Sequence, residues 1–278
     1  MGQSKIVDAN FLRSPLLEDY FRANASNRVV FSDHVSMECY KGSGLANLSR
    51  SLNIVSRYSS QVVVLMSTRE IIASQSRSSY TTTPPALVDK NQTRAFRRFC
   101  EGVRHAVDGR APDLEGHLLV KSRLANDHFA RVLADAEVGS QAIRAITAQF
   151  DPTLLKQLRT HAPISSEGAE AITTGILQVA AILFRDHPDV DRMPSGERLP
   201  GSLVFRYAVA AYVLALRWIS DGGIDSVPVK RLSNDLVDVT HVAYATYFDG
   251  VLSADRKLND LYEEADWLLR NVFTTGPA

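Results

Sequence analysis

The sequence predicts an α/β fold in which a parallel sheet, built from both ends of the chain, is interrupted by a large all-helical insertion. Three short apolar stretches, Ile6–Val7, Arg28–Phe31 and Gln61–Met66, predict strands separated by helical patterns. The third stretch is apolar along nearly its whole length, as a strand covered on both faces must be. From about Asn91 to Ile219 the apolar residues recur only at helical spacing, which predicts the insertion.

Helices are expected between the strands. Leu16–Ala23 has its large apolar side chains on one side, and Leu45–Tyr58 shows the same amphipathic pattern. Ser32 is placed to cap a helix that directly follows the second strand. The polar stretch Ser74–Pro85 ends in two prolines and predicts a boundary or a mobile loop.

The expected domain division follows this pattern. Residues 1–75 and 225–278 form the sheet domain, with a last helix of about Lys257–Val272 covering the sheet, and residues 76–224 form the insertion. The most apolar window, Leu203–Ile219, carries Arg206 and Arg217 and falls short of the ~20 apolar residues that a membrane span needs. It is therefore expected to be a buried core helix, with no membrane as a partner.

Composition limits the partners and the cellular compartment that we expect for the protein. The chain has 278 residues and equal numbers of basic and acidic residues, 31 each, so the net charge does not indicate nucleic acid and any basic surface must be local. Two cysteines, Cys39 and Cys100, do not make a disulfide framework. Because the first strand begins close to residue 1, no signal peptide is expected, and we expect a cytoplasmic protein.

Four acidic residues stand where such a sheet gathers side chains. Asp8 follows the first strand, Glu38 lies early in the helix after the second, Asp238 is expected to open a helix, and Asp255 follows a late strand. The carboxyl ends of parallel strands share one edge of the sheet, so these carboxylates are expected to converge there. Converging carboxylates repel unless a cation lies among them, and Mg²⁺ or Mn²⁺ is the natural cation for oxygen ligands.

The segment 234–255, NDLVDVTHVAYATYFDGVLSAD, combines with Val7–Asn10 and Val35–Glu38 in a recognisable pattern. The chain resembles PIN-like domain nucleases over about residues 1–75 and 225–278. This resemblance implies a three-layer α/β/α fold and metal-dependent hydrolysis of phosphodiester bonds, most often in RNA. It also implies catalytic and metal-binding roles for the four acids, with a Ser or Thr two residues before the last Asp.

Several neighbours of the acids have two open interpretations. Asp235 shares a helix face with Asp238 and is either a fifth metal ligand or a helix cap favoured by the helix dipole. Ser253 either positions a phosphate or hydrogen-bonds to Asp255, and Asn10 is expected to steady Asp8.

Two basic groups are candidates for contact with substrate. The run from Arg94 through Arg97 and Arg98 alternates with aromatic residues, as nucleic-acid surfaces do, although it also fits a helix with one solvated face. Lys230 and Arg231 precede the acidic helix and either meet a substrate phosphate or belong to a solvated turn.

The sequence therefore predicts a metal-dependent endoribonuclease acting on single-stranded RNA, and it leaves open whether the role is that of a toxin, a defence effector or an RNA-processing enzyme. Two alternatives stay open: a nuclease for single-stranded or flap DNA, and a PIN-like module that does not cleave and serves as an interaction or regulatory protein. The uncharged run Tyr207–Leu216 must be buried, and a homodimer is one way to bury it.

Overall fold

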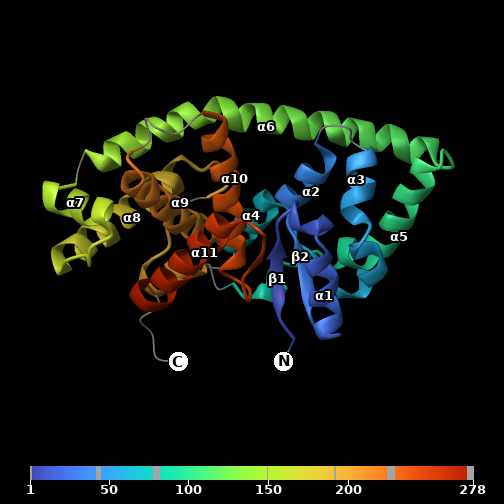
Figure 1. Ribbon diagram of the computed structural model, residues 1–278, viewed down its shortest axis with the longest axis horizontal. Helices are drawn as coiled ribbons and strands as arrows, with labels where there is room; N and C mark the ends of the chain where they lie inside the picture. The colour runs from blue at the N-terminus through green and yellow to red at the C-terminus, as the bar shows by residue number, and fades with distance from the viewer. Residues whose placement is uncertain are drawn as a thin grey trace. The chain divides into compact units, whose positions relative to one another are not determined.

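The computed structural model describes residues 2–41, 45–77, 82–148, 150–190, 192–223 and 229–273, and 72% of the chain is helical (Figure 1). The chain divides into two compact units. The first, here called the sheet unit, comprises Met1–Ile71, Thr83–Ala130 and Tyr244–Asn259. The second, here called the helical unit, comprises Ile72–Thr82, Arg131–Ala243 and Asp260–Ala278. These boundaries differ from the expected ones: residues 83–130 group with the sheet, and residues 225–243 and 260–278 group with the helices.

The sheet unit is built on four parallel strands in the order β3-β2-β1-β4. The strands are β1 (Ser4–Val7), β2 (Arg28–Phe31), β3 (Val62–Val64) and β4 (Val251–Leu252). In the central pairing Ile6 lies opposite both Val30 and Val251, so the first strand joins the two ends of the chain. The predicted α/β class with a parallel sheet is confirmed, and the arrangement is compatible with three α/β/α layers.

Short helices connect the strands, and longer ones make up the rest of the chain. In the sheet unit they are η1 (Phe11–Arg13), α1 (Pro15–Ala23), α2 (Asp33–Tyr40), α3 (Leu45–Leu52), η2 (Val55–Gln61), η3 (Pro84–Leu87) and α5 (Lys90–Val107). The helical unit contains α7 (Pro152–Thr160), α8 (Ser166–Asp186), η4 (Gly196–Gly201), α9 (Leu203–Ser220) and η6 (Leu269–Phe273). Residues of both units contribute to α4 (Thr68–Arg77), α6 (Pro112–Thr147), α10 (Val229–Ala245) and α11 (Arg256–Leu268).

Local sequence explains where the helices of the sheet unit begin. The Ser14 hydroxyl accepts a hydrogen bond from the Leu16 amide at 3.3 Å, and Pro15 fills the first position of α1. Ser32 caps α2 in the same way, accepting from the Val35 amide at 3.3 Å, as its position after β2 predicts. Capped starts directly after strands place α2 at the carboxyl edge of the sheet.

The predicted helix Leu45–Tyr58 is too long. It ends at Leu52 and is followed by the tighter turns of η2, in which Tyr58 has non-helical angles (φ −117°, ψ 32°). The Tyr58 ring stacks on Phe21 of α1 with 4.7 Å between ring centroids, which a continuous helix would not permit. Gln61 belongs to this turn rather than to β3, so the predicted strand Gln61–Met66 shortens to Val62–Val64.

One face of the sheet carries a continuous apolar core. Val29 and Phe31 of β2 are buried there against Leu48 of α3 and Phe96 of α5. Phe31 and Phe96 are in ring contact, with centroids 5.4 Å apart. Helix α5, predicted as part of the insertion, therefore completes the core of the sheet unit.

In the helical unit, α9 is the buried core helix that the sequence predicts. Twelve of its side chains are buried, and Tyr212 among them is 1% exposed. The helix ends before Gly222 and Gly223, whose φ angles of +107° and +97° favour glycine. The Gly223 amide closes the end by donating to the Trp218 carbonyl at 2.7 Å.

Two described helices, α8 and α9, have the length and composition of a membrane span. The two helices differ in burial. In the most apolar stretch of α9, 67% is buried inside the protein, and in that of α8 22% is buried. Core helices of water-soluble proteins pass the same test of length and composition, so this is weak evidence for a membrane.

Two other local predictions are wrong. Ser74 lies in α4, which continues to Arg77, so the first part of the expected loop Ser74–Pro85 is helical; residues 78–81 lie outside the described part of the chain. Asp238 does not open a helix, because α10 already begins at Val229. The helical pattern runs back from Val239 through Leu236 to Leu232, and the first and last of these are buried.

Candidate functional site at the carboxyl edge of the sheet

Asp8 is held at the end of the central strand. Its backbone amide donates to the Leu252 carbonyl at 3.0 Å, which continues the β1–β4 ladder and places Asp8 beside the end of β4. Its carboxylate is 8% exposed. Oδ1 accepts from the Asn10 amide at 3.2 Å and Oδ2 from the Ser253 hydroxyl at 2.9 Å. Asn10 therefore steadies Asp8 as expected, but through its backbone.

Ser253 connects Asp8 to Asp255. Its hydroxyl donates to Asp8 and accepts from the Asp255 amide at 3.0 Å. The Asp255 carboxylate is exposed, and its Oδ1 accepts from the Lys257 amide at 2.8 Å, which caps α11. Asn259 donates to the Ser253 and Asp255 carbonyls at 3.1 and 2.8 Å. The turn after β4 is thus fixed, because one hydroxyl joins the Asp8 carboxylate to the backbone amide of Asp255.

Glu38 lies on α2, half-buried, next to Cys39. The pKa of the Cys39 thiol is raised to about 12, mainly by burial and in smaller part by the negative charges of Glu38 and Asp8. Glu38 lies on the helix that follows β2, the strand next to β1, which Asp8 follows. Ser51 and Arg13 act in the opposite direction on this pKa.

The side-chain atoms at this edge are of the kind that bind a hard cation. The side chains of Asp8, Ser253 and Asp255 offer only oxygen atoms as possible ligands, and oxygen is the ligand atom that Mg²⁺ prefers. Within the described residues, no three His, Cys, Asp or Glu side chains are gathered closely enough to hold an ion. Mg²⁺ usually keeps several waters and takes one or two protein carboxylates together with substrate phosphates, so a pair of acids fits this ion.

Asp235 and Asp238 belong to the helical unit. Both lie in the interior of α10, beyond its first turn, so the interpretation of Asp235 as a cap favoured by the helix dipole is wrong. Asp235 Oδ2 instead accepts a hydrogen bond from the indole of Trp218 at 3.0 Å. Asp238 is half-buried, and its role as a metal ligand stays a prediction of the sequence.

The arginines of α5 are all exposed. Arg97 pairs with Glu101 at 3.1 Å, and Arg94 and Arg98 lie on the same side of the helix, opposite the buried Phe96. This is the helix with one solvated face that the sequence allows, and it leaves contact with RNA untested. Lys230 and Arg231 lie in the first turn of α10, and their side chains are outside the described part of the protein.

Sequence reasoning missed a second polar group at this edge. The Asp33 carboxylate, at the end of β2, accepts from the Thr68 amide at 2.7 Å and from its hydroxyl at 2.9 Å. Because the Thr68 hydrogen is used there, the Tyr244 hydroxyl, 2.8 Å away, must donate to Thr68. The pKa of Tyr244 is raised well above its usual value by burial and by the Asp33 charge, which keeps Tyr244 a donor. The sequence does carry one signal for this group, because Asp33 directly follows Ser32, the serine that caps α2 at the end of β2.

Both thiols are expected to be unreactive. Burial raises the pKa of Cys39 and of Cys100 to about 12, so at pH 8 their thiolate fraction is about a thousandfold below that of an unfolded chain. Alkylation by iodoacetamide, followed by mass spectrometry, should be slower in the folded protein by that order. The same protein in urea is the control, and rapid labelling of either folded thiol would contradict the assigned burial.

The fold and this edge define a class: a parallel α/β unit whose central strand ends in a buried aspartate hydrogen-bonded to the turn after the neighbouring strand. Comparison of the chain with protein-family profiles, characterised protein sequences and solved structures found no match.

Proposed function

We propose that the protein is a metal-dependent endonuclease of the PIN-like kind, which hydrolyses phosphodiester bonds in single-stranded RNA. The observation that carries this proposal is the Asp8–Ser253–Asp255 connection between the ends of β1 and β4. Two further points support the proposal. The strand order puts β1 next to β4, so that Asp8 and Asp255 both follow strands at the carboxyl edge. The resemblance of segment 234–255 to PIN-like nucleases gives Asp255 a metal-binding role.

In this proposal the residues at the carboxyl edge bind the metal ion or position its ligands. Asp8 and Asp255 would hold Mg²⁺ or Mn²⁺, and the Ser253 hydroxyl fixes the Asp8 carboxylate by donating to its Oδ2. A bound ion of this kind activates water and neutralises charge that builds on the phosphate. Glu38 adds negative charge from α2, and the sequence assigns Asp238 as the fourth acid. This chemistry needs no nucleophilic side chain.

RNA is the proposed partner, in the cytoplasm, and a toxin, a defence effector and an RNA-processing enzyme would all act on it. The exposed Arg94, Arg97 and Arg98 provide a local cationic surface on a chain whose net charge is zero. Such a surface recognises phosphates without reading bases. Substrate choice must therefore come from elsewhere in the protein.

The test is a cleavage assay on labelled single-stranded RNA, single-stranded DNA and a flap substrate, each with Mg²⁺, Mn²⁺ or EDTA. Cleavage of RNA with either metal and none in EDTA supports the proposal. Preference for DNA or the flap supports the DNA nuclease instead. Absence of cleavage on all three substrates, with a folded protein, leaves the non-cleaving interaction module.

Self-association is a separate expectation. Helix α8 exposes Leu177 and Ile182, which are 37% and 49% exposed, on a helix of high hydropathy. Light scattering at micromolar concentration should give a dimer, and Ile182→Glu should shift it to the monomer. The control is Ser60→Glu, exposed in η2 of the sheet unit and outside α8, which should leave the dimer intact. A monomeric wild-type protein would contradict the expectation.

A further inference from the structure

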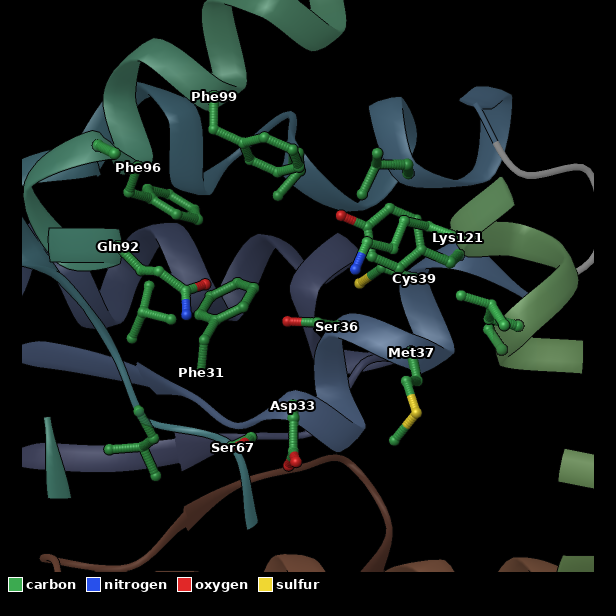
Figure 2. A pocket seen from close by; sticks show the side chains of 18 residues that line it. Phe31, Asp33, Ser36, Met37, Cys39, Ser67, Gln92, Phe96, Phe99 and Lys121 are labelled. Carbon is green, nitrogen blue, oxygen red and sulfur yellow. The ribbon is translucent and has the colours of Figure 1, made fainter. Parts of the chain in front are cut away.

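The sheet unit contains a cavity of about 500 Å³ that the proposed chemistry does not use (Figure 2). Its walls come from the ends of β2 and β3 and from α2, α3, α5 and α6, all within the same unit. Ligand pockets in proteins occupy roughly 300–1,000 Å³, so this volume suits a small organic group. Asp33, just after the carboxyl end of β2, and Cys39, next to Glu38 on α2, are part of its wall, so the cavity lies at the carboxyl end of β2.

Aromatic rings dominate one side. Phe31, Phe96 and Phe99 all line the cavity, and the first two are in ring contact at 5.4 Å with planes 55° apart. Phe99 is half-buried and leaves part of its ring to the hollow. Walls of this kind suit a flat aromatic guest, because stacking on rings does not depend on the identity of the guest's polar atoms.

Polar groups stand around these rings. Figure 2 shows Gln92 on the same side as Phe31 and Phe96, Ser36 between, and Lys121 on the opposite side. Gln92 donates one N–H to Asp89 at 2.8 Å, which leaves its carbonyl oxygen and second N–H for a guest. The Ser36 hydroxyl donates to the Ser32 carbonyl at 3.2 Å, so its oxygen can accept. These groups match a ring with donors and acceptors along its edge.

Lys121 supplies the charge. It lies on α6 at the rim of the cavity and forms no ion pair with any residue that the structure describes. Asp33, which also lines the cavity, is already committed to Thr68 and does not neutralise the lysine. A phosphate attached to the guest would meet this ammonium group.

We propose that this cavity binds a nucleobase, with the attached phosphate at Lys121. The proposal rests on the proposed nuclease function and names the part of the substrate that the arginines of α5 cannot read. The same chemistry comes from two sources, a free nucleotide or one unstacked base of single-stranded RNA. An aliphatic ligand would use the apolar walls but leave Gln92, Ser36 and Lys121 without partners.

The experiment measures binding by the full chain in EDTA, so that no cleavage occurs. Calorimetry with the four ribonucleosides and their 5′-monophosphates, and anisotropy with a labelled pentaribonucleotide, compare the two sources. Lys121→Ala should weaken nucleotide binding about tenfold and leave nucleoside binding unchanged, because it removes only the phosphate contact. Arg123→Ala, exposed on the same helix and outside the cavity wall, is the matched control and should change neither.

A second variant fills the cavity. Ala95→Phe, from α5, should weaken nucleoside, nucleotide and oligonucleotide binding at least tenfold while circular dichroism stays unchanged. A pentanucleotide bound much more tightly than any mononucleotide identifies RNA as the source, and equal affinities identify a free nucleotide. Binding of oligonucleotide that Ala95→Phe does not change would overturn the proposal, as would binding of a fluorescent fatty acid with no nucleoside binding. Nucleotide binding without RNA cleavage in the metal assay would refute the nuclease and leave the cavity assignment standing.

Discussion

Asp8→Asn is expected to reduce RNA cleavage about a thousandfold, equivalent to about 4 kcal/mol of transition-state stabilisation, by removing a charge that holds the ion. The substitution preserves shape, and its amide oxygen still accepts from the Asn10 backbone. The Ser253 hydroxyl can reverse its role and accept from the new amide group. The loss should therefore be one of chemistry rather than of folding, measured as single-turnover cleavage at saturating Mg²⁺.

Asp249→Asn is the matched control. Asp249 also sits beside β4, but at its opposite end, where its carboxylate accepts from the Ser4 amide at 2.7 Å. The asparagine oxygen can take over that bond, so cleavage should stay within twofold of wild type. Equal activity of the Asp8→Asn variant and wild type would refute the metal site, and equal loss in both variants would point to a general effect on the sheet.

Periodicity and strand-end chemistry made the sheet predictable. Arg28–Phe31 was predicted with its observed bounds, and the position of Ser32 predicted the start of α2, because capping acts within one turn of the chain. Asp8 and Asp255 are predicted from their places after strands, and Ser253 from the resemblance to PIN-like nucleases. Their hydrogen-bonded connection follows from the β1–β4 pairing, which joins residues 245 positions apart.

What could not be predicted depends on tertiary contacts. The helix that stops at Leu52 is limited by the stacking of Tyr58 on Phe21, which no local pattern reveals. Helix α10 extends back to Val229 because Leu232 finds burial, so a carboxylate expected at a helix start lies in its interior. The grouping of α5 with the sheet rests on Phe96 meeting Phe31, a contact between distant segments.

The Asp33–Thr68–Tyr244 group illustrates the same limit. Each residue is unremarkable in the sequence, and only the fold brings the end of β2, the start of α4 and the end of α10 together. The direction of its hydrogen bonds is fixed, since Asp33 only accepts. This group and the Asp8–Ser253 pair lie after neighbouring strands, so the carboxyl edge is held by two separate polar connections.

Gln61→Met is expected to destabilise the sheet unit by about 3 kcal/mol. The Gln61 side chain is 8% exposed, and its amide nitrogen donates to three carbonyls, those of Phe21, Asn24 and Asn27, at 3.1–3.3 Å. These carbonyls lie in the last turn of α1 and in its connection to β2. Methionine has nearly the same length and no donor, so all three hydrogen bonds would be lost at roughly 1 kcal/mol each. The Asn24 and Asn27 carbonyls would keep the Asn27 amide and the Arg28 guanidinium as donors.

The loss of stability should be confined to the sheet unit, so the measurement must report on the two units separately. Amide hydrogen exchange followed by mass spectrometry should show faster exchange in β1, β2 and β3 of the Gln61→Met variant, at about a hundredfold for a loss of this size, with α8 and α9 unchanged. Gln178→Met, on the exposed side of α8, is the matched control and should alter protection by less than a factor of about two. If Gln61→Met leaves exchange in the three strands at the wild-type rate, the three-carbonyl contact does not hold the α1–β2 connection, and the register that places Asp8 at the edge must be fixed by strand pairing alone.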